Sequence, residues 1–105
     1  MNETEFLDLT DSVLETIQTA LDTAGIDVDY QLNGGVLELE FDDGSKIIVN
    51  RHLPNREIWV AARSGGFHYA PDASGHWLNT RDGSELFAAL ASLIAVAAGE
   101  PFHFD

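Results

Sequence analysis

The sequence predicts an α+β fold, a two-layer sandwich in which two terminal helices pack on one face of a five- or six-stranded antiparallel sheet. Three observations support this prediction. Apolar residues recur at helical spacing near both ends of the 105-residue chain, short runs rich in branched and aromatic residues fill the middle, and tight turns join those runs. Because short turns join antiparallel neighbours, the runs form one sheet that two helices can cover. The length suits a single domain, residues 1–105.

The first element is a helix over residues 4–24. Asn2 and Glu5 have the spacing of a capping box at its start, and Gly25 suits the left-handed conformation that ends many helices. Apolar residues at steps of three and four form one stripe, which we expect to be buried. The stripe comprises Phe6, Leu9, Val13, Ile17, Leu21 and Ala24.

Strands are expected next. Four clear ones cover residues 27–32, 36–41, 45–51 and 57–62, and two weaker ones cover 67–69 and 76–78. Turns rich in Gly, Asn, Asp and Pro separate the clear strands. In the fourth strand, alternation places Ile58 and Val60 on one side and Glu57 and Trp59 on the other.

The last element is a helix over residues 84–98, with apolar residues along one side and Gly99 and Pro101 beyond its end. The tail over 102–105 is expected to pack back on the fold, because two exposed phenylalanines at a terminus would be unusual.

Charge is distributed very unevenly along the chain. Of 18 acidic residues, 12 lie in the first 43 positions, and the first basic residue is Lys46. The net charge of −13 therefore belongs almost wholly to one end, which indicates a surface for cations or for a basic partner. The same charge disfavours nucleic acid and anionic lipid as partners, because both require clustered Lys and Arg.

Composition also excludes several classes of protein. The absence of cysteine excludes disulfides, a thiolate zinc site, a catalytic thiol and a cysteine-ligated cluster. The longest apolar stretch, residues 86–98, is shorter than the roughly 20 residues that span a bilayer. The N-terminus lacks the pattern of a secretory signal, so we expect a cytoplasmic protein without a membrane segment. Ser64 lacks the setting of a nucleophile elbow, and no catalytic centre is expected.

The first candidate site is an acidic ridge with carboxylates on the first helix and the adjoining strand. It comprises Asp8, Asp11, Glu15, Asp22, Asp27 and Asp29. Carboxylate oxygens suit hard cations, and a bound cation would relieve the repulsion between like charges at i,i+3 and i,i+4. Composition alone favours the alternative that the ridge is a solvated helix face. A binding role requires that the bases of the chain leave the ridge unneutralised. These bases are Lys46, Arg51, Arg56, Arg63 and Arg81.

Several stretches of the chain resemble the frataxin family. They are Asn33-Gly34-Gly35-Val36-Leu37, Ile47-Ile48-Val49-Asn50-Arg51-His52-Leu53-Pro54, Ile58-Trp59-Val60-Ala61 and Ser64-Gly65-Gly66-Phe67-His68-Tyr69. The Asn-Arg-x-x-Pro and Ile-Trp-Val pieces are specific at this spacing. The resemblance covers essentially the whole chain and is strongest to the bacterial branch of the family.

The resemblance implies an iron-binding accessory or regulatory protein of iron–sulfur cluster assembly, which is not an enzyme. Frataxins bind iron weakly and contact the cysteine desulfurase and the scaffold protein that carries the cluster. For this chain, the resemblance implies ferrous or ferric iron on the acidic ridge and a monomer without iron. It also implies a partner-binding surface on the sheet. That surface comprises Asn50, Arg51, His52, Trp59 and His68.

Other interpretations stay open. From the residues alone, a core position for Trp59 is favoured over an exposed one. The chain also fits an acidic adaptor that binds a basic protein partner without a metal role, or an enzyme that oxidises ferrous iron on the ridge. His68 and His76 are weaker metal candidates, because lone histidines on strands are more often surface residues.

Overall fold

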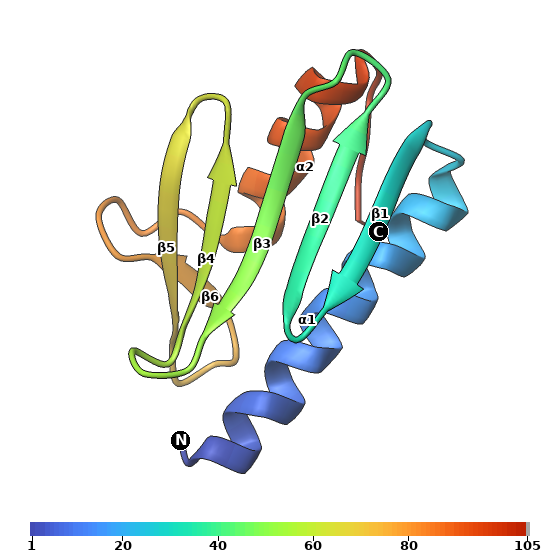
Figure 1. Cartoon of the computed structure of the whole chain (residues 1–105). Helices are drawn as coiled ribbons and strands as arrows, with labels where there is room; N and C mark the ends of the chain where they lie inside the picture. Colours follow the sequence, from blue (N-terminus) through green and yellow to red (C-terminus); the bar gives the residue numbers. More distant parts are fainter. Residues whose placement is uncertain (105) are drawn as a thin grey trace.

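The computed structural model describes residues 1–104 and shows a six-stranded sheet with both helices on one face (Figure 1). The strands lie side by side in sequence order, and each pair of neighbours is antiparallel. The predicted fold class is confirmed, with element boundaries within two residues of those expected. The elements are α1 (Glu3–Ala24), β1 (Val28–Asn33), β2 (Val36–Phe41), β3 (Lys46–His52), β4 (Glu57–Ala62), β5 (Gly65–Pro71), β6 (Trp77–Asn79) and α2 (Leu86–Ala98).

Helix α1 begins and ends as its sequence predicts. The Asn2 side chain accepts a hydrogen bond from the backbone N–H of Glu5 at 2.8 Å, and the Glu5 carboxylate accepts one from the backbone of Asn2. Gly25 closes the helix with φ 67°. The buried stripe differs from the prediction, because Leu9 is 45% exposed and Ala24 is also exposed, whereas Thr10 is buried. Burial of Thr10 is tolerated because its hydroxyl donates to the carbonyl of Phe6 at 2.8 Å.

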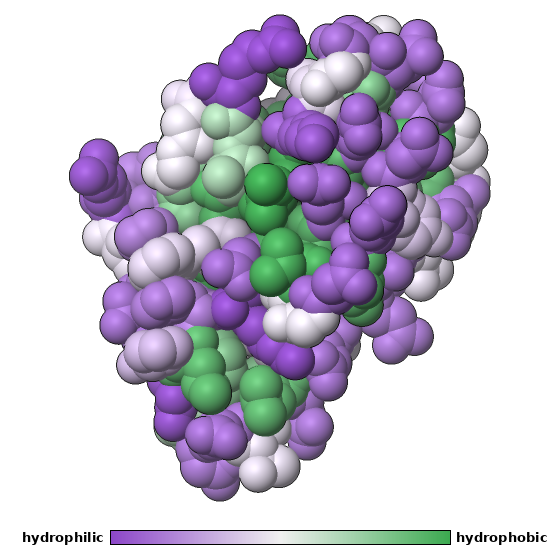
Figure 2. Space-filling model, viewed as in Figure 1, coloured by the Kyte–Doolittle hydropathy of each residue, from purple (hydrophilic) through white to green (hydrophobic). Residues whose placement is uncertain are grey.

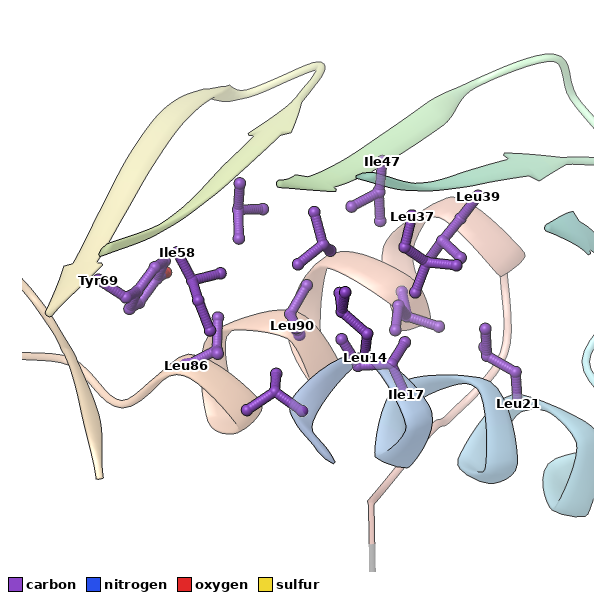
Figure 3. Close-up of a cluster of buried hydrophobic side chains, with 14 of the residues drawn as sticks. Leu14, Ile17, Leu21, Leu37, Leu39, Ile47, Ile58, Tyr69, Leu86 and Leu90 are labelled. Carbon is purple, nitrogen blue, oxygen red and sulfur yellow. The ribbon is translucent and has the colours of Figure 1, made fainter. Parts of the chain in front are cut away.

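One hydrophobic core fills the space between the sheet and the helices (Figure 3). Alternate residues of the central strands, among them Leu37, Leu39 and Ile58, point toward the helices and are almost fully buried. The helices meet them with an apolar stripe each. The stripes comprise Phe6, Leu14, Ile17, Leu21, Leu86, Leu90 and Ile94. Truncating such a side chain to alanine typically costs 2–5 kcal/mol, so this core fixes the position of α1 against the sheet.

The C-terminal tail packs back on the fold, as its phenylalanines predict. Phe102 is buried, and the ring of Phe104 meets Phe87 and Phe102 edge-on at centroid distances of 5.0 Å. The part of the prediction that concerns Asp105 lies outside the described residues. No helix within residues 1–104 is long and apolar enough to cross a membrane.

Both helices lie on one face of the sheet, so the other face is not covered by any helix. In Figure 1 the sheet lies in front of the helices, and Figure 2 shows the same view with hydrophilic residues over most of the surface and apolar residues exposed in patches. We refer to this side as the open face. The fold thus presents two distinct surfaces, the outer side of α1 and the open face.

Candidate functional site

The four helix carboxylates of the predicted ridge all lie on the exposed side of α1, which also carries Glu3 and Glu5 in its first turn. We call Asp8, Asp11, Glu15 and Asp22 the helix row. Successive members are three, four and seven residues apart. At 1.5 Å per residue, the row extends over about 21 Å. It is therefore a line of charges rather than a cluster.

The two remaining acids of the predicted ridge lie at the start of β1. Asp27 precedes β1 and is exposed. Asp29 points to the open face, because its neighbours Val28 and Tyr30 pack against the core on the helix side. There it lies opposite Glu40 on β2. The expectation that Asp29 extends the helix row is corrected, because strand alternation turns its side chain to the other face of the sheet.

The carboxylates do not form a ready-made metal cage. Within residues 1–104, no three side chains of His, Asp or Glu converge in a way that would hold a metal ion. A cation on the helix row would therefore have one or two carboxylate ligands, with water in its other coordination positions.

Two members of the helix row have partners. The Nη1 of Arg51 on β3 donates to Oδ1 of Asp11 in an ion pair that joins the sheet to α1. The expectation that the bases leave the ridge unneutralised is therefore wrong at Asp11. Asp22 accepts a hydrogen bond from the hydroxyl of Tyr30 at 2.9 Å. Within residues 1–104, Asp8 and Glu15 form no ion pair.

The bond between Tyr30 and Asp22 joins β1 to α1 and changes the chemistry of the phenol. The hydrogen bond favours the protonated phenol, and the nearby negative charge opposes its ionisation. Together with partial desolvation, these effects raise the pKa of Tyr30. Both carboxylate oxygens of Asp22 lie 2.9 Å from this hydroxyl.

Three rings stack on the open face, with Trp59 of β4 in the middle. The ring of His52 on β3 lies 3.6 Å from the indole, with 9° between the planes, and that of His68 on β5 lies 4.3 Å away with 7° between the planes. The strand register places His68 directly opposite Trp59. The prediction that Trp59 lies on the uncovered side is confirmed, and both faces of its indole are covered by imidazoles.

Glu57 holds the stack in place. Its Oε1 accepts the indole N–H of Trp59 at 2.8 Å and lies 3.7 Å from Nδ1 of His68. Glu57 was not among the predicted site residues, although strand alternation already placed it on the same side as Trp59. The Nδ1 of His52 is buried and has no hydrogen-bond partner within residues 1–104, so stacking is the main contact of this ring.

The predicted partner-binding residues separate into two groups. Asn50 lies opposite Trp59 in the register of β3 and β4, and thus belongs with the stack. Arg51, the next residue, points to the helix side, where it meets Asp11. Its predicted place beside Trp59 is corrected, because consecutive side chains of a strand point to opposite faces. We call the remaining set, with Glu57 added, the Trp59 surface. It comprises Asn50, His52, Glu57, Trp59 and His68.

His76 lies in the loop before β6, with its Nδ1 3.7 Å from Oδ2 of Asp72. It belongs to neither surface.

The fold and its two surfaces define a small α+β domain with charge on one side and an aromatic stack on the other. A family model described as a frataxin-like domain matches residues 1–100. An iron–sulfur cluster assembly protein CyaY of Vibrio cholerae is 50% identical over 104 residues, which cover 99% of each chain. A protein of the same name from Paraburkholderia xenovorans is 45% identical over 105 residues, 100% of this chain and 99% of the relative. The chain belongs to the frataxin family.

Solved structures of frataxins share the fold. A frataxin from Psychromonas ingrahamii superposes with a TM-score of 0.93 at 35% identity, covering 100% of this chain and 99% of the other. A trimeric frataxin from the yeast Saccharomyces cerevisiae, crystallised in complex with ferrous iron, gives a TM-score of 0.74 at 25% identity over 88% of this chain and 87% of the other.

Proposed function

We propose that this protein is an iron-binding accessory or regulatory factor of iron–sulfur cluster assembly, without a catalytic centre of its own. The observation that carries the proposal is the 50% identity, over 99% of both chains, to a protein named for that process. The charge of the chain and the exposed carboxylates of α1 support the iron-binding part. The expectations of a cytoplasmic location and of a monomer without iron stay predictions.

The helix row is the proposed iron site and the proposed contact for the cysteine desulfurase. Carboxylates bind ferric and ferrous iron through oxygen, and an open row with water in the remaining positions binds weakly. The same charges attract a basic patch on a protein surface. Such a contact weakens with salt, because exposed charges are screened over about 10 Å at 0.1 M.

The Trp59 surface is the proposed contact for the scaffold protein. Tryptophan is enriched among residues that dominate binding energy, and the stack holds this one in a fixed orientation. Because the imidazoles cover both faces of the indole, a partner meets its edge and the outer sides of the two histidines. The Glu57 carboxylate accepts the indole N–H of Trp59, and this bond fixes the shape of the surface at its centre.

Reconstitution of cluster formation tests this proposal. The rate of cluster assembly on the scaffold is measured with desulfurase, with and without this protein, over a range of ferrous iron concentrations. We expect the protein to change the rate in an iron-dependent way, and expect this effect to disappear in Trp59→Ala. A rate that is the same with and without the protein at every iron concentration would falsify the proposal.

An acidic adaptor without a metal role is the second candidate, and two observations favour it. Asp11 and Asp22 already have partners in the fold, and no metal cluster is assembled within residues 1–104. Titration with ferrous iron followed by NMR separates the two functions. Broadening confined to the amides of residues 8–22 supports iron binding, whereas an unchanged spectrum supports the adaptor.

A further inference from the structure

The contact between Arg51 and Asp11 connects the sheet to the helix row. Among the ion pairs of residues 1–104, this is the one that reaches α1. The two residues are 40 positions apart in sequence. The side chain of Arg51 is 22% exposed and that of Asp11 is 66% exposed. The guanidinium is therefore partly enclosed, while the carboxylate that it holds remains accessible from solvent.

The Arg51 side chain lies against the turn between β1 and β2, at a position where the turn has a glycine. The backbone N–H of Arg51 donates to the carbonyl of Gly35 at 3.1 Å, and its side chain runs directly over that glycine. A Cβ on Gly35 would overlap Nε of Arg51 and lie 2.8 Å from its Cγ. The preceding Gly34 has nothing within 4 Å of the same position. The Arg51 side chain can therefore follow its observed path only because Gly35 has no side chain.

Asp11 is also the member of the helix row on which chelation depends. Neighbours on a helix surface are three or four residues apart, and in the helix row only Asp8–Asp11 and Asp11–Glu15 have that spacing. Asp8 and Glu15 are seven residues apart, as are Glu15 and Asp22. Seven residues correspond to about 10 Å along the helix, too far for two carboxylates to share one ion. While Arg51 holds Asp11, both neighbouring pairs are incomplete.

We propose that Arg51 is an internal competitor that controls access to the helix row. A metal ion, or a basic side chain of a partner, that bridges Asp11 and either Asp8 or Glu15 competes with the guanidinium for the Asp11 carboxylate. This inference rests on the proposed function and specifies how that site is regulated. It makes weak binding a property of the fold, because a cation that binds Asp11 competes with an existing ion pair. A doubly charged ion competes with Arg51 better than a singly charged one does.

The first test compares two variants that lose the same charge. Arg51→Gln and Arg63→Gln each remove one positive charge, and Arg63 is exposed in the turn after β4, where it forms no ion pair within residues 1–104. Binding of Mn²⁺ is measured from the broadening of the amide signals of residues 8–15. We expect Arg51→Gln to bind about two- to fivefold more tightly than Arg63→Gln, the range for loss of an exposed competing ion pair. Equal affinities overturn the inference.

The second test displaces Arg51 without changing any charge. Gly35→Ala crowds the Arg51 side chain, whereas Gly34→Ala does not, although both glycines have positive φ, 83° and 58°. We expect tighter Mn²⁺ binding in Gly35→Ala and wild-type affinity in Gly34→Ala. If strain at positive φ unfolds either variant, a double variant decides instead. Arg51→Gln must have no effect on affinity when it is combined with Asp11→Asn, and an effect that persists there overturns the inference.

The failure of this inference is distinguishable from the failure of the proposed function. If neither the wild type nor Arg51→Gln binds Mn²⁺, iron binding on the helix row fails. Binding of an octalysine peptide at low salt then decides the role of Arg51, because that contact needs no metal. Tighter binding by Arg51→Gln than by Arg63→Gln supports the internal competitor, and equal binding overturns it.

Discussion

The helix row and the Trp59 surface are built by opposite physical means. The row consists of carboxylates spread along about 21 Å of helix, all of them exposed and with few bonds to the rest of the protein. The Trp59 surface consists of rings that are fixed against one another by stacking and by the carboxylate of Glu57. The first surface acts through long-range charge and the second through contact. Only the first is expected to respond strongly to salt.

One strand serves both surfaces. On β3, Asn50 and His52 point to the open face, and Arg51 between them points to α1. The comparison therefore teaches that two surfaces of different character are separated here by a single residue step along a strand.

The largest effect is expected from a substitution in the Trp59 surface. Trp59→Ala removes the middle ring of the stack, and we expect the affinity for the scaffold protein to fall more than about thirtyfold, since substitutions at such anchors cost ~2 kcal/mol or more. Calorimetric titration at low and high salt measures it, and urea unfolding of the variant checks that the fold is retained. A loss of affinity that depends on salt as steeply as desulfurase binding would contradict the division between charge and contact.

The second-largest effect is expected from substitutions in the helix row. Asp8→Asn combined with Glu15→Gln removes the two members of the helix row that form no ion pair within residues 1–104. We expect desulfurase affinity to fall about three- to tenfold, from up to ~1 kcal/mol per exposed charge. We also expect the helix to become slightly more stable, by about 0.2–0.5 kcal/mol for each repulsion that is relieved.

Asp42→Asn combined with Glu100→Gln is the control for total charge, because it also removes two negative charges and both residues are exposed outside the helix row. Binding by surface plasmon resonance and thermal unfolding provide the two measurements. The same loss of affinity in the control would mean that net charge, and not the helix row, attracts the desulfurase.

A smaller effect is expected from a substitution that removes one of the two imidazoles stacked on Trp59. His68→Ala uncovers one face of the indole, and we expect a loss of stability of about 0.5 kcal/mol, the low end for an aromatic pair because His68 is half exposed. Acrylamide should quench the fluorescence of Trp59 more efficiently, while the buried Trp77 provides a constant background. His76→Ala, a histidine outside the stack, is the matched control. Unchanged quenching in His68→Ala would show that the rings do not stack in solution.

The smallest effect concerns the bond between Tyr30 and Asp22, and it depends on pH. The pKa of Tyr30 is raised in the folded protein, mainly by its hydrogen bond to Asp22. A raised pKa means that the bond contributes its full stability below the ordinary tyrosine pKa of about 10, and that this contribution is lost as pH rises through the folded value. Urea unfolding between pH 8 and 11 should therefore show a steeper loss of stability for the wild type than for Tyr30→Phe. Parallel curves would argue against the bond.

Local pattern predicted most of the fold and part of the site. Helical spacing, the capping box and the turn residues gave every element to within two residues. Alternation along the fourth strand placed Trp59 on the open face correctly. The same rule, applied to β3 and β1, would have assigned Arg51 to the helix side and Asp29 to the open face, so those two corrections were within reach of the sequence.

Other features depended on contacts between elements. The stack requires three strands in one register, which brings residues from β3, β4 and β5 together. The pairing of Arg51 with Asp11 requires that α1 cross the sheet at one position and that Gly35 leave space for the side chain. Neither condition is encoded in the spacing of residues along any single element.

The sequence by itself determined the fold class, the accumulation of negative charge on α1 and the exposure of Trp59, because each follows from the periodicity of one helix or strand. Only the tertiary structure decided which charges are free and which rings are covered. The physical reason is that an ion pair across 40 residues and a stack across three strands exist only once the core has fixed the distance and register between elements.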